Sequence, residues 1–221
     1  MSAPLLHSIN NHHFWLSAER CIFWEEAQTL ILSDTHFGKT GHFRKNGIAV
    51  PQQVYKEDLQ RFVQQVTHFK PQQIIVVGDL FHSRENRELE LFLKWRRDMV
   101  HTRLVLVRGN HDLLDAAWYA AADIEVQEGI YQIDAFDFVH DPADNTETIK
   151  GRYSFSGHIH PGVSLQGTAK QCLQFPCFFF GKQQCILPAF SRFSGIKIMR
   201  SQKSDSVYAI ADGTIMKLRS S

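Results

Sequence analysis

Short apolar runs alternate with amphipathic segments along the first half of the chain. The runs at 29–32, 74–77 and 104–107 are rich in Leu, Ile and Val, which predicts buried strands. Residues 51–69 and 87–99 carry apolar side chains at helical spacing, and the first of these segments begins with a proline, as helices tolerate. The alternation predicts strand-helix units whose strands lie parallel in one α/β sheet.

The second half of the chain has a different pattern of apolar residues. After about residue 123 the apolar runs are short and show little helical periodicity, which predicts a second, β-rich layer. These runs are 124–127, 136–139, 153–156, 184–187 and 207–210. The Phe-rich stretch 175–191 is interpreted as core strands with edge prolines. Because no Gly/Ser-rich linker or internal repeat interrupts the sequence, we expect residues 1–221 to form a single domain.

Composition narrows the functional classes. The chain is 43% hydrophobic and 21% charged, which is ordinary for a soluble globular protein. A net charge of +1 does not suit a strongly basic nonspecific nucleic-acid coat. No apolar run is long enough to span a membrane and no secretory signal is recognisable, so we expect a cytoplasmic protein without membrane association. The cysteines lack Cys-x-x-Cys spacing and are interpreted as small apolar side chains.

Five short polar motifs occur in a fixed order, and four of them directly follow an apolar run. Their carboxylates, imidazoles and single amide are groups that hold divalent metal ions. The motifs are Asp34-Thr-His36, Gly78-Asp79, Gly109-Asn110-His111-Asp112, His140 and Gly157-His158-Ile-His160. Because the carboxyl ends of parallel strands meet at one edge of a sheet, we expect a metal site at that edge.

The residue types indicate how two ions would share these ligands. Two ions that act in hydrolysis lie about 3.5 to 4 Å apart and need a ligand that bridges them. Asp79 is the best bridging candidate, because it follows a glycine in the middle of the set and its carboxylate has one oxygen for each ion. Asp34 and His36 can serve one ion, while Asn110 serves the other.

The motifs differ in how specific they are. Asp-x-His and Gly-Asp are weak signals alone, and an isolated histidine such as His140 is usually a core residue. Gly-Asn-His-Asp and Gly-His-x-His are much rarer, and together in this order they favour a metal site. His158 and His160 can reach one ion each.

The order of the motifs resembles that of the calcineurin-like metallophosphoesterase superfamily, over residues 31–161. The resemblance implies a four-layer α/β/β/α sandwich of two mixed β-sheets flanked by helices. It also favours manganese, whereas ligand types alone suit Mn, Fe or Zn equally. By this similarity the first ion is held by Asp34, His36, Asp79 and His160, and the second by Asp79, Asn110, His140 and His158.

A site of this kind predicts a phosphoesterase. A hydroxide that bridges two ions is a nucleophile at neutral pH, because metal binding lowers the pKa of water. His111 is not needed as a ligand, so we expect it to stabilise or protonate the leaving oxygen, with Asp112 fixing its tautomer. Asp112 is alternatively the N-cap of a helix that starts at Leu113.

One subfamily is closer than the others. Residues 36–51, preceded by 14–24, are similar to the bacterial DNA-ligase-associated metallophosphoesterases. Those are proposed DNA-repair endonucleases or phosphodiesterases, encoded with a ligase, a helicase and a nuclease. Phosphoprotein phosphatases carry Gly-Asp-x-x-Asp-Arg-Gly and Gly-Asn-His-Glu instead, which disfavours that activity here. We therefore expect hydrolysis of phosphodiester bonds, in DNA and in a repair context.

The substrate stays open at this point. Basic residues beside the motifs can hold the phosphates of a nucleic acid, or form an ordinary solvated rim. They are Lys39, Arg44, His82, Arg84 and Arg108. A hydrolase of small phosphodiesters or nucleotides is the alternative, since a near-neutral charge neither requires nor excludes a polymer. A non-catalytic scaffold is disfavoured by the complete ligand set.

Overall fold

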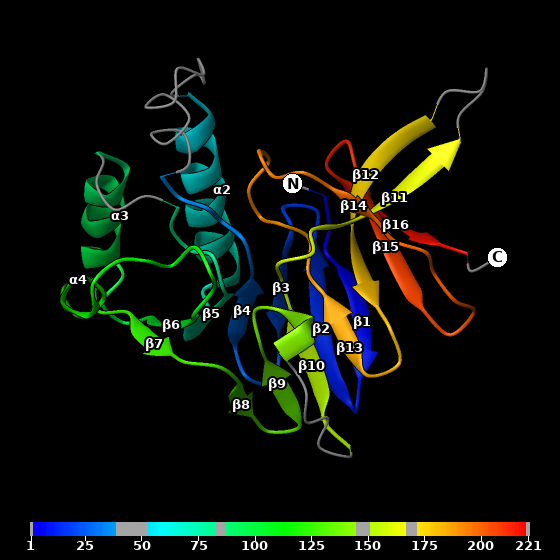
Figure 1. Ribbon diagram of the computed structural model, residues 1–221, viewed down its shortest axis with the longest axis horizontal. Coiled ribbons are helices and arrows are strands. Elements are labelled where there is room, and N and C mark those ends of the chain that lie inside the picture. Colours follow the sequence, from blue (N-terminus) through cyan, green and yellow to red (C-terminus); the bar gives the residue numbers. More distant parts are fainter. Residues whose placement is uncertain (1, 39–52, 83–86, 145–150, 167–171, 220–221) are drawn as a thin grey trace.

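The computed structural model describes residues 2–38, 53–82, 87–144, 151–166 and 172–219. Two mixed β-sheets lie against each other, with helices on the far side of the first sheet (Figure 1). In spatial order the first sheet contains β1 (Leu5–Ile9), β2 (His12–Ser17), β3 (Cys21–Trp24), β4 (Thr29–Leu32), β5 (Gln73–Val77), β6 (Arg103–Val107) and β7 (Glu125–Gln127). Strands β4 to β7 are parallel, and β1 to β4 are antiparallel.

The second sheet is formed by the later part of the chain. In order it contains β14 (Lys197–Ile198), β11 (Pro161–Gln166), β12 (Cys172–Phe180), β13 (Gln184–Ile186), β10 (Tyr153–Ser156), β9 (Phe136–Phe138) and β8 (Tyr131–Ile133). Strand β15 (Ser206–Ala211) pairs with β12 and with β16 (Thr214–Leu218). The predicted α/β fold with two mixed sheets is confirmed, including the Phe-rich stretch as strands β12 and β13.

The three central strands are apolar on both faces because each face packs on a different core. Leu30, Ile74 and Leu104 occupy paired positions and belong to the cluster under the helices. Ile31 and Ile75, one position further along, face the second sheet. Successive strand residues point to opposite faces of the sheet. Because both faces of these strands are covered, both sets of residues are apolar and the usual alternation of polar and apolar residues is absent.

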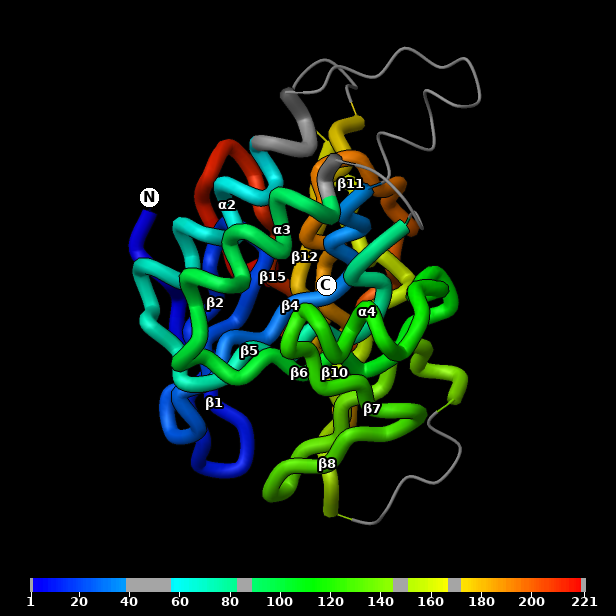
Figure 2. Tube along the Cα trace, turned by 90° about the vertical axis from the view of Figure 1, so that its left-hand side faces the viewer, coloured from blue at the N-terminus to red at the C-terminus, as the bar shows by residue number. Residues whose placement is uncertain are grey.

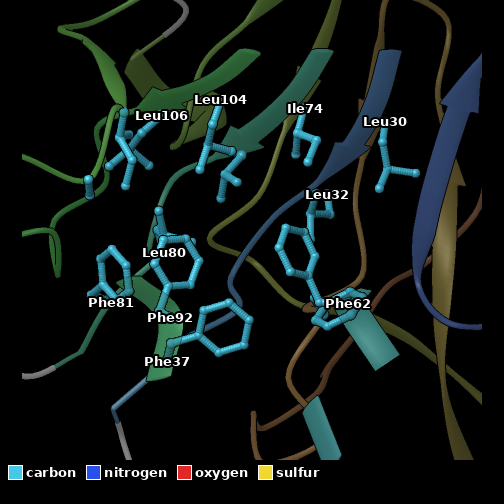
Figure 3. Close-up of a cluster of buried hydrophobic side chains, with 14 of the residues drawn as sticks. Leu30, Leu32, Phe37, Phe62, Ile74, Leu80, Phe81, Phe92, Leu104 and Leu106 are labelled. Atoms are coloured by element: carbon cyan, nitrogen blue, oxygen red, sulfur yellow. The ribbon is translucent and has the colours of Figure 1, made fainter. Parts of the chain in front are cut away.

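Helices α2 (Gln53–Phe69) and α3 (Arg87–Arg97) cover the outer face of the first sheet, and Figure 2 shows them in front of it. Phe62 of α2 and Phe92 of α3 pack with Leu32 and Leu80 in the buried cluster drawn in Figure 3. Both predicted helices are confirmed, although α3 ends two residues before Met99. A shorter helix, α4 (Ala116–Ala121), follows β6, and a 3-10 turn lies at Pro142–Asp144.

The core between the sheets is largely aromatic. Phe14 and Trp24 stack with ring centroids 5.6 Å apart, and Phe136 from the second sheet meets Phe14 edge to face at 5.2 Å. The strands that supply Phe14 and Trp24 are outside the sequence predictions. Cys177 and Cys185 are buried in the second sheet, whereas Cys172 is exposed, so its interpretation as an apolar filler is wrong. Within the described segments, no helix is long and apolar enough to cross a membrane.

A histidine at the edge of this core makes stability depend on pH. His7 of β1 lies against Phe180, with ring centroids 4.0 Å apart, and its Nδ1 is 2.8 Å from the Tyr208 hydroxyl. Burial, together with the charge of Lys217, lowers the pKa of His7 to about 4. The unfolded chain, with a histidine pKa of about 6.5, therefore binds the proton first, and stability falls as pH drops through this window.

We predict that His7→Phe reduces this loss of stability. Between pH 7.5 and pH 5 the free energy of unfolding should fall by about 1 kcal/mol less in the variant than in the wild type, after allowance for partial exposure. Urea unfolding in the presence of a chelator measures this difference without metal effects. His101→Phe, which removes an exposed histidine, is the matched control. An identical pH dependence for His7→Phe and wild type would contradict the prediction.

Candidate metal centre

The loops after β4, β5 and β6 lie beside one another at the carboxyl end of the first sheet. Backbone hydrogen bonds join the first two motifs, because Asp34 N donates to Gly78 O over 3.0 Å and His36 N donates to Asp79 O over 2.9 Å. The third motif is tied to them by His111 N, which donates to Asp79 Oδ1 over 2.9 Å. The parallel register of the three strands thus places three motifs together.

A first group of metal-binding side chains consists of Asp34, His36 and His160, whose donor atoms all lie within 4.8 Å of one another. His160 Nε2 is 3.2 Å from Asp34 Oδ1. Asp34 and His36 are buried, whereas His160 is partly exposed. The group therefore opens to solvent on the side of His160, which comes from the connection between β10 and β11.

A second group contains Asp34, Asp79 and His140, again with donor atoms within 4.8 Å of one another. Around His140 Nε2 lie Asn110 Oδ1 at 3.2 Å and His158 Nδ1 at 3.3 Å. Asp79 Oδ1 is 3.5 Å from the same nitrogen. All seven residues predicted as ligands therefore meet in one place, from the ends of strands in both sheets.

Asp79 belongs to the second group and also faces a member of the first. Its Oδ2 is 4.0 Å from His36 Nδ1, while its Oδ1 faces His140. One oxygen toward each group is the orientation that a bridging carboxylate requires. Asp34 belongs to both groups. The bridging role stays a prediction, with geometry that suits it.

The donor chemistry of the second group fits a divalent cation. His140 Nδ1 is 3.1 Å from the carbonyl oxygen of Val77 and can donate its proton there, which leaves the lone pair of the neutral ring on Nε2. That lone pair faces two oxygen acceptors, Asn110 Oδ1 and Asp79 Oδ1. Electron-pair donors that face one another repel unless a cation lies among them, so these residues suit a metal ion.

The two central carboxylates differ in their proton affinity. Burial alone would raise the pKa of Asp34, but the hydrogen bond and charge of His160, with the nearby His140 and His36, hold it below its usual value. Burial raises the pKa of Asp79, and the charge of Asp34 adds to this, against the opposing effects of His140 and of His111 N–H. Asp34 is thus the more strongly ionised of the two.

The backbone at the ligands is strained. Positive φ angles, near +50° to +60°, are found at five of the seven predicted ligands. They are Asp34 (52°), His36 (47°), Asp79 (55°), His158 (63°) and His160 (53°). Each such residue costs roughly 1 kcal/mol or more relative to an ordinary conformation, and this strain typically gathers at functional sites.

Two motif glycines are required by the close packing of the ligands. Gly78 has a φ of +79°, and a Cβ there would come 1.9 Å from His140 Nδ1. A Cβ on Gly109 would come 2.3 Å from Asp79 Oδ1 and 2.5 Å from the Asp79 amide nitrogen. Any side chain at these positions would displace a ligand, which explains the glycine in Gly-Asp and in Gly-Asn-His-Asp.

The Asp112 carboxylate binds the backbone of the neighbouring loops and not the ring of His111, whose tautomer it was predicted to fix. Its buried carboxylate accepts backbone N–H groups from Asp79 at 2.8 Å, Phe81 at 3.1 Å and Gly109 at 2.9 Å. Burial raises the pKa of Asp112 to about 6, against the effect of these donors. The alternative interpretation of Asp112 as an N-cap is wrong, because α4 begins at Ala116 with Asp115 as its N-cap residue.

His111 lies at the exposed mouth of the centre. Its ring centroid is 4.4 Å from that of His82 and 5.6 Å from that of His36. The structure thus places His82, which was predicted to bind substrate, beside the ligands. Both rings can reach a group bound between them and the metal-binding side chains.

The other predicted substrate contacts divide into two sets. Lys39, Arg44 and Arg84 lie outside the described residues. The Arg108 guanidinium bonds to Glu128 at 2.7 Å and to the carbonyl oxygen of Asp112 at 2.6 Å. The Arg108 guanidinium thus binds other groups of the protein, and its contact with a substrate phosphate stays a prediction.

One neighbour of the centre was missed by the sequence analysis. Asp141 Oδ2 lies 3.7 Å from His158 Nε2 and can orient that ring. The available signal was its place directly after His140 at the end of a predicted strand. The sequence does not show that the next motif folds back onto it.

Comparison with solved structures shows similarity over nearly the whole chain. The crystal structure of Pseudomonas putida nuclease MPE matches with 26% sequence identity and a TM-score of 0.82, covering 97% of this chain and 100% of that one. Yfce, a phosphoesterase from E. coli, matches with 13% identity and a TM-score of 0.48, covering 86% of this chain and 97% of that one. No curated protein sequence matched.

Comparison with protein families gives a direct assignment. A family model described as calcineurin-like phosphoesterase matches residues 27–170, a segment that contains all five motifs. Members of this family bind divalent metal ions, and the clustered Asp and His side chains can hold them. The chain therefore belongs to the calcineurin-like phosphoesterase family and is a metal-dependent hydrolase of phosphate esters.

Proposed function

We propose that this protein is a two-metal phosphodiesterase that cleaves DNA. The observation that carries the proposal is that two groups of metal-binding side chains share Asp34, and that Asp79 of the second group directs one oxygen toward His140 and the other toward His36 of the first group. Two-metal sites of this type serve in-line displacement at phosphorus. A nucleic acid as the substrate is supported by the similarity, along nearly the full length of both chains, to a protein described as a nuclease, and the resemblance to the DNA-ligase-associated subfamily favours DNA.

The ligands divide between the two ions as the sequence analysis expects. In this proposal Asp34, His36 and His160 would hold one ion, Asn110, His140 and His158 would hold the other, and Asp79 would offer a carboxylate oxygen to each. When bound, the ions neutralise phosphate charge and supply a water of lowered pKa, and manganese is our preferred metal. The protein contributes fixed positions for the ligands, through the hydrogen bonds of Asp112 and the Val77 carbonyl.

His111 acts on the leaving group in this proposal. Its exposed position at the mouth allows it to exchange protons with solvent and to approach the oxygen that departs from phosphorus. His82, with its ring beside that of His111, donates a hydrogen bond to a phosphate oxygen. The subfamily resemblance supports a role in DNA repair, in functional association with a ligase, a helicase and a nuclease.

One prediction for the metal centre concerns Asp79→Asn. The variant should lose about 100-fold or more in metal affinity, because removing a ligand is at least as costly as removing its supporting contacts. Hydrolysis of bis-(4-nitrophenyl) phosphate, a mono-aryl phosphate, cyclic nucleotides and nicked or single-stranded DNA should fall together. Elemental analysis and assays with added Mn²⁺ measure both effects. Full activity in this variant would refute the two-metal proposal.

The substrate panel tests the choice of DNA in the wild type. Turnover of nicked or single-stranded DNA is the expected result. Activity confined to small diesters or cyclic nucleotides would replace DNA by a small phosphodiester as the substrate. Asp98→Asn, which makes the same carboxylate-to-amide change at an exposed residue that is neither a predicted ligand nor a predicted substrate contact, is the matched control for Asp79→Asn.

The second prediction concerns His111→Gln. A proton donor contributes roughly 10²- to 10⁴-fold to a rate, and it contributes more when the leaving oxygen is more basic. DNA cleavage should therefore fall by about 100-fold or more. Hydrolysis of bis-(4-nitrophenyl) phosphate, whose leaving group is weakly basic, should fall much less, and the metal content should not change. Equal losses on both substrates would argue against this role.

A further inference from the structure

The segment 189–197 begins and ends beside the first group of predicted ligands, at Asp34 and at His160. It joins β13 to β14 and is the orange loop between them in Figure 1. At one end Ser191 N donates to Asp34 O over 3.1 Å, and at the other end Lys197 N donates to His160 O over 2.9 Å. We call residues 191–197 the rim segment, because both of its ends are bonded to predicted metal ligands.

Two arginines hold the start of the rim segment in place. Arg20 Nη1 donates to Ala189 O at 3.2 Å and to Ser191 O at 2.9 Å. Arg61 Nη1 donates to Phe190 O at 3.1 Å, and its guanidinium lies 4.4 Å from the centre of the Phe190 ring. Consecutive carbonyl groups are therefore bound by guanidinium groups, which fixes the course of the backbone here.

Arg61 is itself anchored by acidic side chains. It bonds to Asp58 at 2.6 Å and to Glu19 at 2.7 Å, and its side chain is 7% exposed. On the opposite side, Phe190 N donates to Ser33 O over 2.9 Å. The segment before the rim is thus bonded on both sides, and it presents the following residues in a defined position beside Asp34.

Between its anchored ends the rim segment exposes apolar side chains. Phe193 is 45% exposed and Ile196 is 37% exposed. Ile196 and His160 line the same small hollow, together with Ser194 and Gly195. Arg192 has a side chain that is 52% exposed and lies 3.4 Å from Glu19, a carboxylate that it shares with Arg61, so the two arginines together exceed the charge of Glu19. Phe193 follows Ser191, whose N–H is bonded to Asp34, by two positions, and its N–H donates to the Ser191 hydroxyl over 3.2 Å. A partly exposed aromatic side chain on this segment suits a ligand with both a flat apolar face and a phosphate.

We propose that Phe193 and Ile196 form a platform on which an unpaired nucleobase next to the cleaved phosphate stacks. This inference rests on the proposed function, since it names the part of the nucleic acid that the same centre recognises. Aromatic side chains stack on any base, so the platform selects for single-stranded or frayed DNA rather than for sequence. Arg192 binds a neighbouring phosphate of the same strand.

The test compares substrates with and without a base. Phe193→Ala should raise KM for a single-stranded oligonucleotide about 5- to 100-fold, the range expected for one stacked base. Its kcat/KM for methyl 4-nitrophenyl phosphate, which has no base, should stay at the wild-type value. Phe193→Trp should restore the oligonucleotide KM. An abasic residue beside the cleaved phosphate should raise the wild-type KM but not that of Phe193→Ala.

The controls separate the platform from the metal centre. Leu6→Ala removes an apolar side chain of similar exposure, 41%, from edge strand β1 and should change neither substrate. Equal effects of Phe193→Ala on both substrates, or none on either, would overturn the platform while leaving the phosphodiesterase intact. Wild-type hydrolysis of the methyl diester without any DNA cleavage would instead overturn the DNA assignment of the proposed function.

Discussion

The rest of the structure depends on the enforced proximity of two buried carboxylates, Asp34 and Asp79. In a folded interior two like charges this close repel strongly, and hydrogen bonds alone do not remove that cost. Their imidazole neighbours offset part of it, as the lowered pKa of Asp34 shows, whereas the raised pKa of Asp79 reflects burial and the charge of Asp34. A cation offsets the remainder. The loops therefore keep two negative groups close together, an arrangement that cation binding requires.

Holding Asp34 and Asp79 close together requires a strained backbone, and the packing of the two sheets offsets the cost of that strain. Five of the predicted ligands have positive φ angles, and such strain persists only where the surroundings determine the backbone completely. Here the determinants are cross-loop hydrogen bonds, Asp112 with its three backbone donors, and a rigid sheet behind them. Strand packing on both faces thus stabilises a geometry that an isolated loop would not adopt.

Local pattern predicted the parts of the fold that depend on local physics. The strands before Asp34, Asp79 and Gly109 were recognisable because burial on both faces leaves apolar runs, and the order of the motifs at their ends indicated the candidate ligands. Strand β1 was missed because its burial alternates between intermediate and exposed along an edge, which gives only a weak pattern. The role of Asp112 was missed because its partners are backbone N–H groups. Every residue except proline has such a group, so the amino-acid sequence does not show which ones Asp112 binds.

The anchoring of His160 by Lys197 N links the centre to the last third of the chain. The ligands themselves extend from Asp34 to His160, and the backbone that supports them extends to residue 197. Contacts of such long sequence separation form late and slow the folding of a chain. During synthesis, the supported site can therefore assemble only after residue 197 has emerged from the ribosome, well after the last predicted ligand, His160, has been made.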